Sequence, residues 1–149
     1  MRKIYNLPPQ KGADRMSVFY SIRTADDIAD FLKKTNHLHD GYIIAAEYCN
    51  NGITPIDSGY KFTPEHTQLK IRVMITSIMD AVAEMVFENL VDWTLNNSQV
   101  NIIMGDILDT AVFFNEKGQI VWTDDTANKD NFTENSSYVI AQSMKWRFL

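Results

Sequence analysis

The sequence predicts an α+β fold: a curved antiparallel sheet of about six strands with one short amphipathic helix packed on it. Three observations lead to this prediction. The spacing of apolar residues changes from a helical period to a period of two after His39. The strand-like segments that follow are joined mostly by short turns, without the helices that parallel strands require. The chain then closes on a long alternating segment, residues 138–149.

Residues 1–149 are expected to form one domain, with an irregular segment over residues 1–16. A chain of this length buries roughly 70% of the surface that its unfolded form exposes, which is enough for a core without disulfides. Cys49 is the only cysteine, so no internal disulfide can form, and a cytoplasmic setting is expected. No apolar run is long enough for a secretion signal or a membrane-spanning helix, so no membrane partner is expected.

A helix is predicted over residues 25–34. Thr24 is a good N-cap residue because its hydroxyl can accept a hydrogen bond from a backbone N–H of the first turn. Asp26 and Asp27 favour the positive end of the helix dipole. The residues that form an apolar stripe for packing are Ile28, Phe31 and Leu32.

Strands are predicted wherever apolar and polar side chains alternate. The predicted strands cover residues 16–22, 42–49, 69–76, 85–95, 100–114, 119–123 and 138–149. Gly105 indicates a bend or bulge in the fifth of these strands, and residues 115–118 form a hairpin turn. The stretch 53–67, which contains two prolines, and the polar stretch 124–136 are expected to be connections.

Two of the predicted strands carry an apolar face that is rich in aromatic residues. Alternation predicts that the following residues of the strand 85–95 share one side: Met85, Phe87, Val91, Trp93 and Leu95. In the terminal strand the corresponding residues are Tyr138, Ile140, Met144, Trp146 and Phe148. Because the final residue, Leu149, is an apolar strand position, the C-terminus is expected to be held in the sheet.

The charge balance disfavours one class of partner. The formal net charge is −5, and a surface of that sign repels the phosphate backbone of nucleic acids. Nucleic acid is therefore not expected as a partner.

His37, His39 and Asp40 are the closest approach to a metal-binding cluster. Imidazole nitrogens and a carboxylate on one extended segment are ligand types that zinc and other divalent ions use. A third spaced ligand is needed, and His66 is a candidate. The alternative is that His39 and Asp40 bond backbone groups where the helix leads into the first strand of the sheet. This alternative is the commoner arrangement, so no metal is assigned.

Several aspartates offer oxygen ligands for a calcium or magnesium ion if the strand 100–114 and the loop 124–130 lie side by side. These residues are Asp106, Asp109, Asp124, Asp125 and Asp130. The loop lacks the ligand spacing and final glutamate of an EF-hand. A solvated acidic loop is the alternative.

The sequence offers no catalytic constellation to which a reaction can be assigned. Glu47, Glu84 and Glu88 are carboxylates without a defined separation. Cys49 lies among apolar strand residues, where a small buried side chain is the expected role. There is neither a nucleophile elbow nor a glycine-rich phosphate loop. No catalytic residue and no cofactor are therefore predicted.

The aromatic residues exceed what one short helix can cover. Four of them are candidates for a binding surface: Trp93, Trp122, Trp146 and Phe148. The alternative is that they fill the core beneath the helix. Because one helix cannot shield six strands, the open sheet face is expected to be closed by curling, by the N-terminal segment or by a second subunit. A homo-oligomer is therefore one expectation for the assembly.

Three short segments resemble a group of known proteins. They are Leu38-His39-Asp40-Gly41-Tyr42-Ile43, Met85-Val86-Phe87-Glu88-Asn89-Leu90 and Tyr138-Val139-Ile140-Ala141. They are similar to segments of small uncharacterised bacterial proteins, some of which are assigned as immunity proteins of polymorphic toxin systems. The resemblance implies that the protein binds and neutralises a cognate toxin.

The leading interpretation is a non-enzymatic binding protein of the bacterial cytoplasm, of the immunity type. It depends on the missing catalytic constellation, the acidic charge and the surplus of aromatic strand residues. Two alternatives stay open at this point. One is a small-molecule binding protein or hydrolase with its site between the sheet and the helix. The other is a structural subunit of a homo-oligomer.

Overall fold

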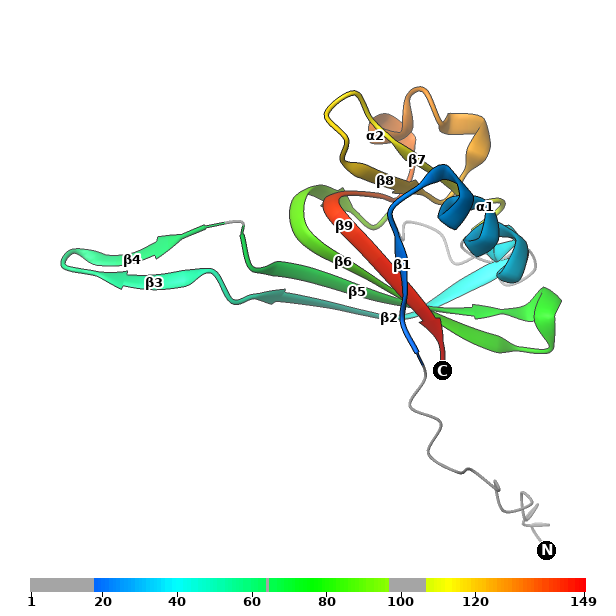
Figure 1. The fold of residues 1–149 in the computed structure, drawn as a ribbon, viewed down its shortest axis with the longest axis horizontal. Coiled ribbons are helices and arrows are strands. Elements are labelled where there is room, and N and C mark those ends of the chain that lie inside the picture. Colours follow the sequence, from blue (N-terminus) through cyan, green and yellow to red (C-terminus); the bar gives the residue numbers. More distant parts are fainter. Residues whose placement is uncertain (1–17, 64, 97–106) are drawn as a thin grey trace, which may run out of the picture.

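A computed structural model describes residues 18–63, 65–96 and 107–149 (Figure 1). The strands are β1 (Tyr20–Ile22), β2 (Gly41–Asn50), β3 (Ile53–Ile56), β4 (Gly59–Phe62), β5 (Thr67–Ile75), β6 (Ala81–Thr94), β7 (Ala111–Phe114), β8 (Ile120–Thr123) and β9 (Tyr138–Phe148). The α-helices are α1 (Ala25–Lys34) and α2 (Phe132–Asn135). Three short 3-10 turns cover Asn36–Leu38, Thr76–Ile78 and Thr126–Asn128.

The predicted α+β class with a curved antiparallel sheet is confirmed. Seven strands form one sheet in the order β2-β5-β6-β9-β8-β7, and β1 pairs with the second half of β9. All the strand pairings are antiparallel. The sheet curls in Figure 1, so that β7 and β8 lie above the inner face of β6 and β9. The terminal strand β9 lies in the interior of the sheet, which fixes the C-terminal part of the chain.

The predicted helix is confirmed as α1, with the predicted bounds. The Thr24 hydroxyl accepts from the Asp27 N–H at 3.2 Å, and the Asp27 carboxylate accepts from the Thr24 N–H at 2.9 Å. This reciprocal capping box satisfies two donors that a helix start leaves without partners. Phe31, on the apolar stripe, is fully buried and meets the Trp146 ring edge-on at 5.1 Å. The helix is thereby fixed on the inner face of β9.

The core occupies the inner face of the curled sheet. Strand β5 shows this most clearly, because Leu69, Ile71, Val73 and Ile75 are buried and the residues between them are partly exposed, as the alternation predicts. Trp122 and Trp146 belong to this core, with 0% and 1% of their surface exposed. Phe148 packs against the same cluster.

The predicted apolar face of the strand 85–95 is wrong at Val91, because β6 bends sharply at Asn89, whereas the other four residues lie in the core or pack against it. Asn89 has a φ of 56°, and the pairing with β9 shifts register between Leu90 and Asp92. Phe87 faces the core before the bend and Leu90 faces it afterwards, while Val91 is left half exposed. A residue inserted into one strand exchanges the two faces and increases the local bend.

The predicted connection over residues 53–67 is also wrong, because β3 and β4 form a two-stranded hairpin there. It pairs Ile53 with Phe62 and Ile56 with Gly59. We call the hairpin, residues 53–62, the arm. Within the described residues, β3 and β4 pair only with each other, and the arm projects far beyond the rest of the sheet in Figure 1. Prolines weakened the strand signal here, but an edge strand tolerates them.

The remaining segments agree with the sequence in part. The predicted turn over 115–118 joins β7 to β8, with Gly118 at a φ of 73°. The stretch 124–136 holds a 3-10 turn and the short helix α2. The expected bend near Gly105 lies outside the described residues. Among the helices that the structure describes, none is long and apolar enough to span a membrane.

Candidate interaction surface

One side of the arm is entirely apolar. Directly paired residues of an antiparallel hairpin point to the same side, as do residues two apart. The pairs Ile53–Phe62 and Pro55–Tyr60 therefore share a side, and we call these four residues the arm strip. Tyr60 and Phe62 are 69% and 65% exposed, and Ile53 and Pro55 are also exposed. A side chain of this kind that faces water adds no hydrophobic stabilisation.

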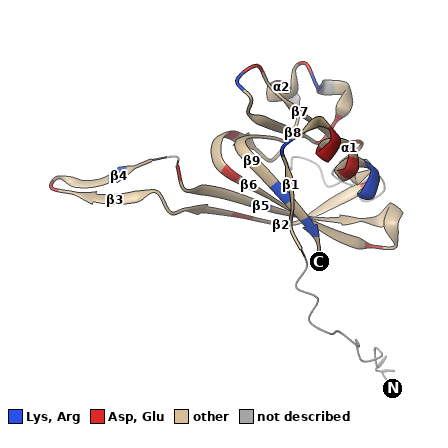
Figure 2. Ribbon diagram, viewed as in Figure 1, with Lys and Arg blue, Asp and Glu red and all other residues tan. Residues whose placement is uncertain are grey.

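The opposite side of the arm has a different composition. It carries the pairs Thr54–Lys61 and Ile56–Gly59. Within residues 53–62 the only charged side chains are Asp57 and Lys61, and Figure 2 shows the arm as a mostly uncharged projection. The arm strip itself has no charged residue, so no charge opposes its burial against another apolar surface.

An aromatic-lined hollow of about 390 Å³ lies where the arm joins the sheet. We call it the arm-base hollow. The Tyr48 and Trp93 rings stack with centroids 5.7 Å apart, and Tyr48 lies opposite Leu69 in the register, so it is on the core side of the sheet. Its lining residues are Tyr48, Asn50, Phe62, Thr63, Thr67, Leu90, Val91, Asp92 and Trp93. Phe62 belongs to both features, which makes the arm strip and the hollow one continuous surface.

The polar groups of the arm-base hollow are held in place by hydrogen bonds. The Tyr138 hydroxyl donates to an Asp92 carboxylate oxygen at 2.8 Å, and this bond raises the pKa of Tyr138 above its usual value. The Asn50 side-chain oxygen accepts from the Gly52 N–H at 3.0 Å. Asp92 is exposed and accepts further donors readily, because an ionised carboxylate has about four acceptor positions.

Gly52 fixes the direction in which the arm leaves the sheet. The Thr63 N–H donates to the Gly52 carbonyl at 2.9 Å. A Cβ atom at position 52 would lie 2.1 Å from the Thr63 carbonyl oxygen, which is far inside van der Waals contact. The two arm strands therefore approach closely only because position 52 has no side chain.

Two further hollows surround the bend of β6. One, of about 410 Å³, is lined by Glu65, Asn89, Leu90, Val91, Gln119 and Gln142. The other, of about 340 Å³, is lined by Asn51, His66, Thr67, Gln68, Glu88 and Asn89. The bend thus creates a recessed surface beside the arm, and the half-exposed Val91 side chain lines both the first of these hollows and the arm-base hollow.

The structure divides the four aromatic residues that the sequence proposed for a binding surface. Trp93 lines the arm-base hollow. Trp122 and Trp146 are corrected to core residues because their side chains are fully enclosed beneath α1 and β7–β8. Phe148 is partly buried and meets Trp146 edge-on at 5.2 Å. Tyr60 and Phe62 were not predicted as binding residues, although their alternation with Lys61 is a strand signal.

The predicted ligands His37, His39 and Asp40 lie in a left-handed turn at the end of α1. The His37 Nδ1 atom lies 3.6 Å from the Asp109 carboxylate. The His39 Nδ1 atom contacts the backbone carbonyl of Leu108, and its Nε2 atom lies 3.6 Å from the Asp40 carboxylate. His66 is at the arm base. In the described part of the chain, no three His, Cys, Asp or Glu residues gather closely enough to hold a metal.

This turn is strained and firmly held. Its four residues with positive φ, between 49° and 56°, are Asn36, His37, Leu38 and Asp40. Such a conformation costs on the order of 1 kcal/mol for each residue with a side chain. The fully buried Leu38 side chain and a hydrogen bond from the Thr110 N–H to the His37 carbonyl at 2.9 Å hold the turn. The arrangement is a structural clamp between α1 and β7.

The acidic residues proposed for a cation site have separate roles. The Asp125 carboxylate accepts from the Ala127 N–H at 2.9 Å and caps a 3-10 turn. Burial raises the pKa of Asp124 to about 6, and the neighbouring Asp125 charge acts in the same direction. Asp130 is exposed. Asp106 lies outside the described residues.

Glu84 is the most deeply enclosed carboxylate among the described residues, and it lies on the outer face of the sheet. Its side chain is 0% exposed and receives the Arg72 and Arg147 guanidinium groups, each at 2.8 Å. Burial acts to raise the pKa of Glu84, but the hydrogen bonds from the two arginines outweigh it and hold the pKa below its usual range. The register Arg72–Glu84–Arg147 therefore ties three strands together.

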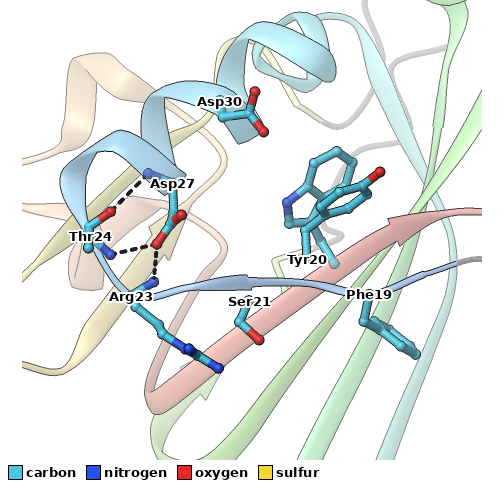
Figure 3. Close-up of a pocket in the computed structure, with 8 residues that line it drawn as sticks. Phe19, Tyr20, Ser21, Arg23, Thr24, Asp27 and Asp30 are labelled. Carbon is cyan, nitrogen blue, oxygen red and sulfur yellow. Dashed lines mark hydrogen bonds between the residues drawn. The ribbon is translucent and has the colours of Figure 1, made fainter.

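A separate hollow of about 420 Å³ lies between β1, α1 and β9 (Figure 3). In Figure 3 the Asp27 carboxylate turns toward the backbone of Arg23 and Thr24, where it completes the helix cap. The Asp30 carboxylate pairs with the Lys34 ammonium at 2.8 Å, and that ammonium lies 4.7 Å from the centre of the Tyr20 ring. The two carboxylates of this hollow thus already have partners within the chain.

Comparison with known proteins identifies no relative from which a function could be proposed. No protein-family model matches this chain, no curated protein matches its sequence, and no solved structure matches its fold.

Proposed function

We propose that this protein is a non-enzymatic binding protein of the cytoplasm, which holds another polypeptide against the arm strip and the arm-base hollow. The observation that carries the proposal is the apolar side of a hairpin that projects from the sheet with Tyr60 and Phe62 mostly exposed. A two-stranded hairpin is only marginally stable without packing on one face. Exposed aromatic residues of this kind mark protein-binding surfaces.

A toxin is the partner class that the resemblance to immunity proteins implies. The formal net charge of −5 would speed the encounter with a basic toxin, while the arm strip would provide the apolar contact. Purification from the native host at low and at moderate salt should recover this partner. Repeated recovery of the protein alone under both conditions would contradict the toxin-binding role.

Site-specific photo-crosslinking in the native host tests the arm itself. A photoreactive amino acid at position 60 should give an adduct with a second polypeptide. The matched control is position 79, because Met79 is 98% exposed at the distant β5–β6 turn. Adducts at position 60 and none at position 79 support the proposal. Equal labelling, or none at either position, contradicts it.

The second candidate function is binding of a small molecule in the hollow between the sheet and the helix. Its volume of about 420 Å³ and its lining, in which the aromatic rings of Tyr20 and Trp146 and two aspartates accompany one arginine, favour a cationic ligand. The Lys34 ammonium lies 4.7 Å from the centre of the Tyr20 ring and pairs with Asp30, so it competes with such a ligand for both lining residues. Lys34→Met should raise the affinity for a small cation such as tetramethylammonium in calorimetry. No binding in this variant, or an affinity equal to that of the native protein, would contradict the candidate.

A further inference from the structure

We propose that the free protein forms a two-fold homodimer in which each copy lays its arm strip across the arm-base hollow of the other. This inference rests on the proposed function, because it identifies the occupant of the same surface. A single chain presents both halves of a reciprocal contact: a projecting apolar hairpin and, at its base, an aromatic-lined hollow. Two-fold symmetry brings such a pair of features together twice.

The position of the hollow determines how the arms must lie. Each arm strand contains four residues, which corresponds to a reach of about 13 Å. If the two arms run antiparallel with their strips in contact, the pair Ile53–Phe62 of one copy faces the pair Pro55–Tyr60 of the other. The tip of each arm then lies over the hollow at the base of the other arm. This one arrangement covers the arm strip and the arm-base hollow of both copies.

The apolar area is sufficient for a weak dimer. Tyr60, Phe62 and Tyr48 are 69%, 65% and 47% exposed, and aromatic side chains offer about 200 Å² each. These rings alone therefore provide roughly 350 Å² per copy, and Ile53, Pro55 and Val91 add to it. Two copies together approach the 1,000 Å² or so at which specific interfaces begin. We expect a dissociation constant on the order of 10 μM.

The polar groups at the contact are also complementary. The Tyr60 hydroxyl lies at the projecting end, and the exposed Asp92 carboxylate lines the hollow. A phenol donates readily to a carboxylate that has acceptor positions left. Lys61 and Asp57 are outside the arm strip, so burial of the strip leaves both charges in water. The one charge that the arrangement covers, that of Asp92, accepts hydrogen bonds from the Tyr138 hydroxyl and from the Tyr60 hydroxyl of the other copy, which offsets the usual cost of burying a charge.

The test uses the full-length purified protein in sedimentation velocity over a concentration series around 10 μM. We expect a reversible monomer–dimer equilibrium. Phe62→Lys should weaken it at least tenfold, whereas Met79→Lys, a change at an exposed residue far from the arm, should leave it unchanged. Near-ultraviolet circular dichroism checks that both variants keep the packed core. A monomer at every concentration, or a dimer that Phe62→Lys does not weaken, overturns the inference.

Disulfide trapping locates the contact without relying on a destabilising change. In a Cys49→Ser background, a Tyr60→Cys chain mixed with a tagged Val91→Cys chain should give a mixed disulfide on mild oxidation. A Met79→Cys chain mixed with the same partner should not. If the first pair forms no disulfide, the inference is overturned.

The results also separate the homodimer from the proposed binding function. If the protein is monomeric but position 60 crosslinks to a different polypeptide in the host, the homodimer is contradicted and the proposed binding function stands. If position 60 crosslinks to no polypeptide, both the homodimer and the proposed binding function are contradicted.

Discussion

The hydroxyl of Thr67 accepts a hydrogen bond from the backbone N–H of Leu90 at 2.8 Å. This bond lies where β6 turns away from β5, one residue after Asn89 with its φ of 56°. The bend removes the strand partner that the Leu90 N–H would otherwise have, and the Thr67 side chain supplies the acceptor instead. The curvature of the sheet, and with it the hollows beside the arm, thus depends on one side chain at the arm base.

Thr67→Val should therefore lower the free energy of unfolding by about 1–3 kcal/mol, because it keeps the shape but leaves a buried N–H without an acceptor. Urea denaturation followed by tryptophan fluorescence measures the change. Thr67→Ser keeps the hydroxyl and serves as the control. If valine and serine give the same stability, the hydrogen bond does not hold the bend.

Much of the fold was predictable because its signals are local. The N-cap at Thr24 and the stripe that ends at Leu32 defined α1 with its observed bounds. The strict alternation of Leu69 to Ile75 identified both β5 and its buried face. Neither signal depends on a distant residue. Short-range patterns of this kind state which side of an element must be covered, although they do not state what covers it.

The candidate surface was not predictable because it depends on the bend and on the exposure of side chains. Alternation placed Val91 on the same face as Phe87, but the bend at Asn89 leaves Val91 half exposed. The same limitation applied to Trp146, since a buried and an exposed aromatic residue have the same period along a strand. Pro55 weakened the strand signal of the arm, and no sequence pattern shows that the hairpin projects.

Glu84 provides a prediction for acid stability. Because the two arginines lower its pKa in the folded state, its contribution to stability is present above the unfolded pKa and is lost as the pH falls through the folded value. The protein should therefore lose stability below a pH of about 4.5. Glu84→Gln should cost about 3 kcal/mol at neutral pH, because two guanidinium groups lose their shared charge.

The melting temperature of the native protein and of Glu84→Gln, measured between pH 3 and pH 7, tests this contribution. We expect the melting temperature to fall less steeply at acid pH in the variant. Glu116→Gln is the control, since Glu116 is exposed in the β7–β8 turn. If the melting temperature of Glu84→Gln falls as steeply at acid pH as that of the native protein, the two arginines do not hold Glu84 ionised.

Asp124 should act in the opposite direction. Burial raises its pKa to about 6, so the folded state favours the protonated form, and the associated stability is lost as the pH rises through 6. Asp124→Asn should therefore stabilise the protein by about 2 kcal/mol at pH 8 and have little effect at pH 4. Chemical denaturation at the two pH values measures the difference. Asp130→Asn, at an exposed position, should change neither value.

Trp146 and Trp93 separate the core from the binding surface in a single experiment. Trp146 is 1% exposed and packs edge-on against Phe31 and Phe148, so Trp146→Ala should cost about 3–5 kcal/mol and lower the melting temperature markedly. Trp93 stacks on the half-exposed Tyr48 at the arm base, so Trp93→Ala should change stability much less. The Trp93→Ala change should nevertheless weaken self-association and lower the yield of photo-crosslinks from position 60, because it removes a wall of the arm-base hollow. Calorimetry and sedimentation on the same two samples measure both quantities. A large stability loss in Trp93→Ala with unchanged association would mean that this ring supports the fold and that the partner lies elsewhere.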